Sequence, residues 1–152
     1  MREYPIIVTD QDLSRLRGLL GGMSQASILD RGHLSQLQSE LDRALVVPCD
    51  EVPVGVVTID SLVRVVDLAT GKRSVLTLVL PDEADVAERR ISVLAPIGAA
   101  LLGSRASDDV EWTMPAGQRR LHIEHVIQPN QLVATRRARS AQYARHSSMG
   151  AN

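Results

Sequence analysis

His122, Glu124 and His125 are the residues whose types and spacing come nearest to a metal site. Side chains two positions apart lie on the same face of a strand, so His122 and Glu124 would share a face and His125 would point away from it. A closed metal site takes about four protein ligands, and no second cluster along the chain supplies the rest. We therefore interpret the three as surface polar residues, and predict no metal site and no cofactor.

Residues suited to nucleophilic catalysis occur singly, without neighbours that would activate them. No Gly-x-Ser-x-Gly pattern places a serine on a nucleophile elbow. Cys49 is followed by Asp50 and Glu51, and two carboxylates disfavour the thiolate that a reactive cysteine needs. The pair Gly21–Gly22 follows a predicted helix instead of preceding one, so it is no phosphate-binding loop. We predict no catalytic residues, no enzymatic activity and no direct small-molecule substrate.

The composition narrows the classes of partner. Of 152 residues, 44% are hydrophobic but only 2% are aromatic, with no phenylalanine and one tryptophan, Trp112. Such a chain can build an aliphatic core, and its low aromatic content disfavours a stacking platform for single-stranded bases or an aromatic cage. The net charge is −1, although residues 131–152 carry four arginines and no acid. Direct contact with nucleic acid is therefore expected only from this Arg-rich tail.

The sequence features also predict the cellular compartment of the protein. A single cysteine cannot form an intrachain disulfide. The N-terminal residues contain no long apolar segment typical of a signal peptide, and no apolar run reaches the about 20 residues that cross a bilayer. We expect a cytoplasmic protein with no membrane contact.

The first third of the chain predicts a helical hairpin. A short strand at 5–8 precedes Thr9, whose hydroxyl suits a helix N-cap, with Asp12 expected to bond back to it. Leucines at helical spacing predict helices over 10–20 and 33–45, of roughly 16 and 20 Å. Between them lies a polar bend at 22–32, whose Asp30 and Arg31 we place at the hairpin tip.

The remainder predicts a small α+β module. Residues 48–55 contain two prolines and a glycine, which favours a boundary there. Apolar alternation then predicts strands at 57–65, 75–80, 91–94, 110–114 and 121–127, with a turn at Asp60–Ser61 and an acidic loop at 81–90. Pro96 suits the first position of a short helix closed by Gly103. We divide the chain into a hairpin (1–52), a sheet domain (53–130) and a flexible tail (131–152).

Two stretches carry a family resemblance. PDEADVAERRISVLAPIGAALLG (81–103) and DDVEWTMPAG (108–117) resemble the C-terminal domain of the Gre transcript-elongation factors. The stretches 34–44 and 53–59 are similar to a Gre-related subgroup with a short hairpin, the regulators of nucleoside diphosphate kinase. The resemblance covers about residues 5–128.

The resemblance implies a fold and a partner. The fold is α+β, a short antiparallel coiled-coil hairpin followed by an FKBP-like antiparallel sheet with one short helix. The partner is RNA polymerase, on which Gre factors dock at the rim of the secondary channel. Docking is expected to use residues of the acidic loop and of the start of the short helix: Asp82, Glu83, Asp85, Ser92, Pro96 and Ile97.

The hairpin sets this chain apart from the Gre factors. Their long hairpin reaches the polymerase active centre, where two acidic tip residues help to bind Mg²⁺ and stimulate transcript cleavage. Here the arms are short and Asp30 is the one acid of 22–32. The resemblance to the short-hairpin subgroup accordingly implies a non-catalytic regulator that competes with Gre factors, contacting nucleic acid only within the polymerase complex or through its tail. Any effect on nucleotide kinases would be indirect.

Two alternatives remain open. The first is an active cleavage factor, which would require a paired-carboxylate tip. The second is a peptidyl-prolyl isomerase, suggested only by the FKBP-like fold. Isomerases of that fold line their pocket with aromatic rings, and this module offers Trp112 alone.

Overall fold

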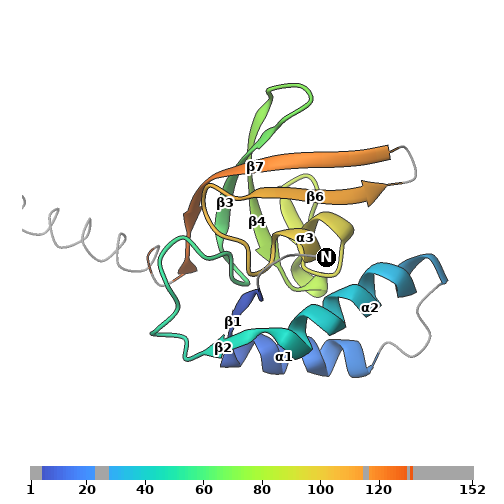
Figure 1. Cartoon of the computed structure of the whole chain (residues 1–152), viewed down its shortest axis with the longest axis vertical. Coiled ribbons are helices and arrows are strands. Elements are labelled where there is room, and N and C mark those ends of the chain that lie inside the picture. The colour runs from blue at the N-terminus through green and yellow to red at the C-terminus, as the bar shows by residue number, and fades with distance from the viewer. Residues whose placement is uncertain (1–4, 23–27, 115–116, 130, 132–152) are drawn as a thin grey trace, which may run out of the picture.

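The computed structural model describes residues 5–22, 28–114, 117–129 and 131, and shows a mixed α+β chain (Figure 1). In chain order its elements are β1 (Ile7–Thr9), α1 (Asp10–Gly21), α2 (Ile28–Arg43), β2 (Leu45–Val47), β3 (Leu62–Asp67), β4 (Arg73–Val79), η1 (Pro81–Glu83), β5 (Arg90–Ser92), α3 (Pro96–Leu101), β6 (Asp109–Met114) and β7 (Gly117–Ile127). No helix among these described parts is long and apolar enough to cross a membrane.

Helices α1 and α2 run side by side beneath the sheet (Figure 1). Thr9 caps α1 as expected, because its Oγ1 accepts a hydrogen bond of 3.0 Å from the Asp12 backbone N–H. Gly21 is the last residue of α1. With 12 and 16 residues, the helices are about 18 and 24 Å long at 1.5 Å per residue.

The second helix differs from its expected extent at both ends. It begins at Ile28, so Asp30 and Arg31 lie in its first turn and not in the bend. In the sequence, Ser27 followed by Asp30 is a pattern typical of a helix start. The helix ends at Arg43. Residues 45–47, one leucine and two β-branched valines, then form the strand β2, which pairs in parallel with β1.

The five-stranded sheet has the order β5-β4-β3-β7-β6. Three of its pairings are antiparallel, but β5 pairs in parallel with β4, which corrects the expectation of an antiparallel sheet. The parallel pairing arises because the chain crosses over through η1 and the loop after it before returning as β5. The strand expected from residue 57 begins only at Leu62, and the residues before it include a turn in which Asp60 has a φ of 70°.

One hydrophobic core joins the hairpin to the sheet. Its N-terminal members are buried together with residues of the turn, of α3 and of the inner face of the sheet. They are Ile6, Val8, Leu16, Leu37 and Leu41. Leu101 and Leu102 of the α3 segment are fully buried. The base of the hairpin is thus packed onto the rest of the molecule.

Two close contacts hold the hairpin against the rest of the molecule, at a junction formed by the segment around Ile6 and the start of α1. Gly103 has a φ of 76°, and a Cβ there would overlap the Ile6 Cβ and lie 3.1 Å from its Cγ2. The buried Asp12 carboxylate accepts a hydrogen bond of 3.0 Å from the Ile59 backbone N–H, across the junction. Asp12 also keeps a local hydrogen bond with Thr9, so the same carboxyl group contacts its own cap and ties α1 to the turn before β3.

Candidate docking face

A groove lies on the inner face of the sheet, beside the start of α3. Its floor consists of the buried side chains of Val65, Leu76 and Leu121, from the three central strands. The half-buried Ile97 and Trp112 complete its apolar lining. The groove has a volume of about 230 Å³ and is open to solvent. Its shape suits a protruding side chain of a partner better than an enclosed ligand, which takes about 300–1,000 Å³.

Charged groups surround this apolar floor. Lys72, Arg89 and Arg119 line the groove, and all three side chains are exposed. Asp67 is the one acid in the lining, and its Oδ2 lies 3.2 Å from the Arg119 guanidinium. The groove therefore presents more positive than negative charge to a partner.

The start of α3 forms one wall of the groove. Pro96 begins the helix as expected, and its side chain is exposed. The Ser92 hydroxyl accepts a hydrogen bond of 3.0 Å from the Leu94 N–H, so it shapes the turn that leads into the helix. Of the six residues that we expected to dock, Ile97 is the one that lines the groove.

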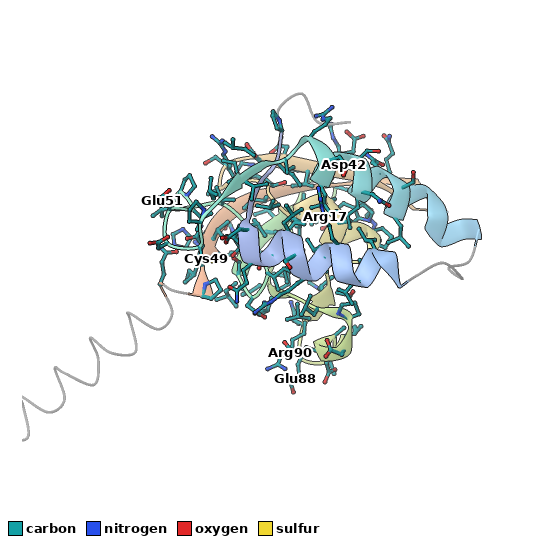
Figure 2. The ribbon with its side chains drawn as sticks, turned by 90° about the horizontal axis from the view of Figure 1, so that it is seen from below. Arg17, Asp42, Cys49, Glu51, Glu88 and Arg90 are labelled. Carbon is teal, nitrogen blue, oxygen red and sulfur yellow. The ribbon has the colours of Figure 1, made fainter. Side chains whose placement is uncertain are left out.

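The acidic loop at 81–90 lies next to this wall, and Arg89 is its one residue that lines the groove. Asp82, Glu83 and Asp85 are exposed, and the Asp85 carboxylate accepts a hydrogen bond of 3.0 Å from the Ala87 N–H. Asp85 and Arg90 also exchange backbone hydrogen bonds of 2.9 and 2.8 Å, which close the loop. Figure 2 shows Glu88 and Arg90 on this loop, which projects from the body of the molecule.

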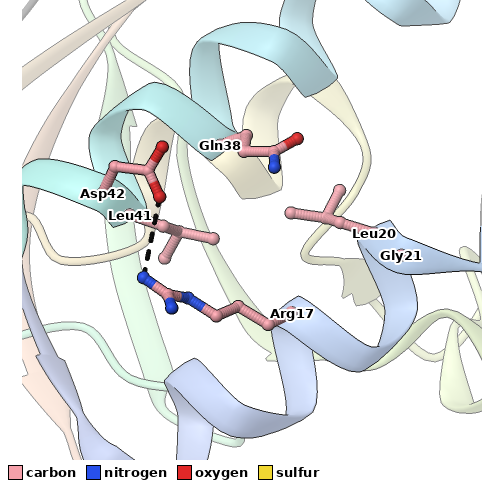
Figure 3. A pocket seen from close by; sticks show the side chains of 6 residues that line it. All are labelled: Arg17, Leu20, Gly21, Gln38, Leu41 and Asp42. Atoms are coloured by element: carbon pink, nitrogen blue, oxygen red, sulfur yellow. Dashed lines mark ion pairs between the residues drawn. The ribbon is translucent and has the colours of Figure 1, made fainter.

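A second cleft lies between α1 and α2 (Figure 3). It has a volume of about 240 Å³, with the buried Leu41 at its base. Arg17 and Asp42 face each other across it at 3.6 Å (Figure 3). An exposed ion pair of this kind contributes at most about 1 kcal/mol. The cleft contains none of the residues that we expected to function, and the connection at 23–27 lies outside the described residues.

The outer face of the sheet holds the residues first considered as metal ligands. Glu124 lies between Arg73 and Arg64, at 2.9 and 3.1 Å. The hydrogen bond from Arg73 lowers the pKa of Glu124, and the charges of both guanidinium groups act in the same direction. His122 Nδ1 lies 2.6 Å from Asp109 Oδ1. Within the described ranges, no three His, Cys, Asp or Glu side chains are placed to hold a metal ion.

Sequence reasoning missed most of the groove. Trp112 and Arg119 are paired neighbours on β6 and β7, and Lys72 comes from the turn before β4. Strand alternation does carry a signal, because Val110 and Trp112 share the inner face. The pairing of β7 with β6 and with β3, and of β3 with β4, however, is what brings these distant segments to one groove.

Two family models match separate parts of the chain. The family model described as "Transcription elongation factor, GreA/GreB, C-term" matches residues 52–128, and the model described as "Rnk N-terminus" matches residues 5–47. The Escherichia coli (strain K12) regulator of nucleoside diphosphate kinase is 38% identical over 117 residues, which cover 77% of this chain and 84% of that protein.

Two further relatives match as well. The transcription elongation factor GreA of Thermodesulfovibrio yellowstonii is 36% identical over 85 residues, covering 56% of this chain and 54% of that protein. The solved structure titled a prokaryotic transcription elongation factor GreA/GreB from Nitrosomonas europaea has a TM-score of 0.69 and 36% identity, covering 83% of this chain and 100% of that one. Both are named as factors rather than as enzymes.

Proposed function

Because the chain belongs to the GreA/GreB family of transcription elongation factors and carries the N-terminal part of the Rnk regulators, we propose that it binds RNA polymerase and competes there with Gre factors without stimulating transcript cleavage. The docking face is the start of α3 with the acidic loop beside it. The part of polymerase that it contacts is the rim of the secondary channel.

The observation that carries the proposal is the placement of the expected docking residues. Asp82, Glu83 and Asp85 are exposed on a loop that is closed by its own backbone hydrogen bonds. Pro96 and Ile97 are accessible at the start of a helix that is packed against β5. A charged, pre-formed surface loses little conformational entropy on binding, which favours association.

The short hairpin supports the absence of cleavage stimulation. Its helices have 12 and 16 residues, and the sequence between them, 23–27, contains no acid. Binding a catalytic Mg²⁺ at a hairpin tip would take closely spaced carboxylates. Asp30 lies in the first turn of α2, without a second carboxylate near it in the sequence.

Removal of the acidic charge tests the docking face. The triple variant Asp82→Asn, Glu83→Gln, Asp85→Asn keeps a side-chain acceptor for the Ala87 N–H while losing three charges. We expect it to recover about tenfold less core RNA polymerase in a pull-down than the intact chain. The control, Asp50→Asn with Glu51→Gln, removes two acids from the exposed linker after β2 and should recover as much polymerase as the intact chain. Recovery by the triple variant equal to that of the intact chain would show that the loop does not dock.

Two assays on the intact chain test the rest of the proposal. It should displace a Gre factor from polymerase and leave a stalled complex uncleaved. Strong cleavage of the stalled transcript would establish the active-factor alternative. Catalysis of proline isomerisation in a short peptide would establish the isomerase alternative.

A further inference from the structure

The groove beside α3 combines an aliphatic floor with a single aromatic ring. Val65, Leu76 and Leu121 are at most 7% exposed, and the half-buried Trp112 lines the same groove. The groove above this floor is open to solvent, so an apolar side chain of a partner can enter it and lose contact with water where it packs against Trp112. Burial of such a side chain contributes about 1.5–3 kcal/mol, which makes Trp112 a suitable anchor point.

The cations around the groove are not all neutralised within the chain. Arg119 is paired with Asp67 at 3.2 Å. Lys72 and Arg89, by contrast, have no ion-pair partner among the residues that the structure describes. Both exposed side chains line the same groove. Lys72 comes from the β3–β4 turn, and Arg89 comes from the loop before β5. A partner complementary to this groove would carry carboxylates next to an apolar side chain.

The surrounding surface favours a polypeptide over a nucleic acid. The first 130 residues carry 13 basic against 18 acidic side chains. A long polyanion would be repelled by most of this surface, including the acidic loop beside the groove. A short acidic segment meets only the local positive charge, and the adjacent acidic loop then restricts its orientation.

From these observations we infer that the groove binds an acidic segment of RNA polymerase, with one apolar side chain of that segment inserted against Trp112. The inference rests on the proposed function and adds to it the chemistry of the partner. It also assigns Lys72 and Arg89 as residues that select the partner through charge.

Charge reversal in the groove tests this inference. In the variant Lys72→Glu, Arg89→Glu we expect the affinity for core RNA polymerase to fall about tenfold or more, and the affinity of the intact chain to weaken as salt is added. The matched control is Arg105→Glu, Arg120→Glu, which makes the same change of charge at exposed positions outside the groove. Circular dichroism melting of both variants checks that each is folded.

Trp112 provides a second readout, because it is the only tryptophan. A short synthetic peptide of glutamates around one leucine should change the Trp112 fluorescence of the intact chain, and should not do so in the charge-reversed variant. The same peptide with glutamines in place of the glutamates should bind at least about tenfold more weakly.

The outcomes separate this inference from the proposed function. If the intact chain binds polymerase and the charge-reversed variant binds it equally well, the groove assignment is wrong and the proposed function stands. If the intact chain does not bind polymerase at all, both are wrong. A stronger fluorescence response to oligo-deoxythymidine than to the acidic peptide would overturn the choice of a polypeptide.

Discussion

Replacement of Gly98 by alanine is expected to lower the free energy of unfolding by about 3 kcal/mol or more. A Cβ at this position would overlap the carbonyl oxygen of Ser92, and would lie 2.9 Å from its carbonyl carbon and 3.1 Å from the Val93 Cα. All three are backbone atoms of the segment that leads into α3, so no side-chain rotation can relieve the overlap. Urea unfolding followed by circular dichroism measures the loss.

The direction of this effect is the informative part. Gly98 lies inside α3, where helix propensity alone predicts that alanine stabilises by about 1 kcal/mol. The matched control is Gly18→Ala in α1, where nothing lies within 4 Å of the new Cβ and the propensity gain of about 1 kcal/mol should appear. Stabilisation by both substitutions would contradict the close packing of α3 on β5.

The second large effect is expected at Asp12. Replacement by alanine leaves the buried Ile59 N–H without its acceptor, which should cost about 2–3 kcal/mol. Replacement by asparagine keeps an acceptor oxygen and should cost less than about 1 kcal/mol. A smaller loss for alanine than for asparagine would show that the hydrogen bond across the junction contributes nothing to stability.

Asp12 also predicts the pH dependence of stability. Burial raises its pKa above the usual 3.8, and this outweighs the hydrogen bond from Ile59 and the charge of Arg15, which lower it. The folded state thus holds the Asp12 proton more tightly than the unfolded state, so the contribution of this carboxyl is full below pH 3.8 and is lost as the pH rises through the raised pKa.

The comparison with Asp12→Asn isolates this carboxyl. Glu124, whose pKa is lowered, contributes with the opposite sign and is present in both proteins. We therefore expect the difference in the free energy of unfolding, intact chain minus Asp12→Asn, to decrease as the pH rises from below 3.8 and then to become constant. A difference that grows with pH would mean that the pKa of Asp12 is lowered instead.

Local signals predicted much of the fold. Thr9 followed by acids, Gly21–Gly22 and Pro96 marked helix ends correctly, because caps depend on residues next to each other in the chain. The sequence did not predict β2, since three apolar residues after a helix also suit another helical turn. Only the pairing of β2 with β1, 38 residues away, decides between them.

The candidate site was less accessible to sequence reasoning. At the hairpin junction, the local contact of Asp12 with Thr9 was predictable, but its bond to Ile59 depends on how the hairpin packs. The groove at Trp112 combines residues from Val65 to Leu121, which no local pattern relates. The family resemblance predicted a role for Ile97 and the acidic loop. The presence of Lys72, Arg89 and Arg119 at one groove follows only from the three-dimensional arrangement.

The shared core has a consequence for exchanging parts between relatives. The two family matches end at residue 47 and begin at residue 52, which suggests a cassette boundary at the linker. Yet Leu16, Leu37 and Leu41 are buried in the same cluster as Val57 and Leu102. A longer hairpin grafted at this linker would leave mismatched volumes at its base. Such a chimaera would need to keep the helix bases, with Thr9 and Asp12, and lengthen the arms only beyond Leu20 and before Leu34.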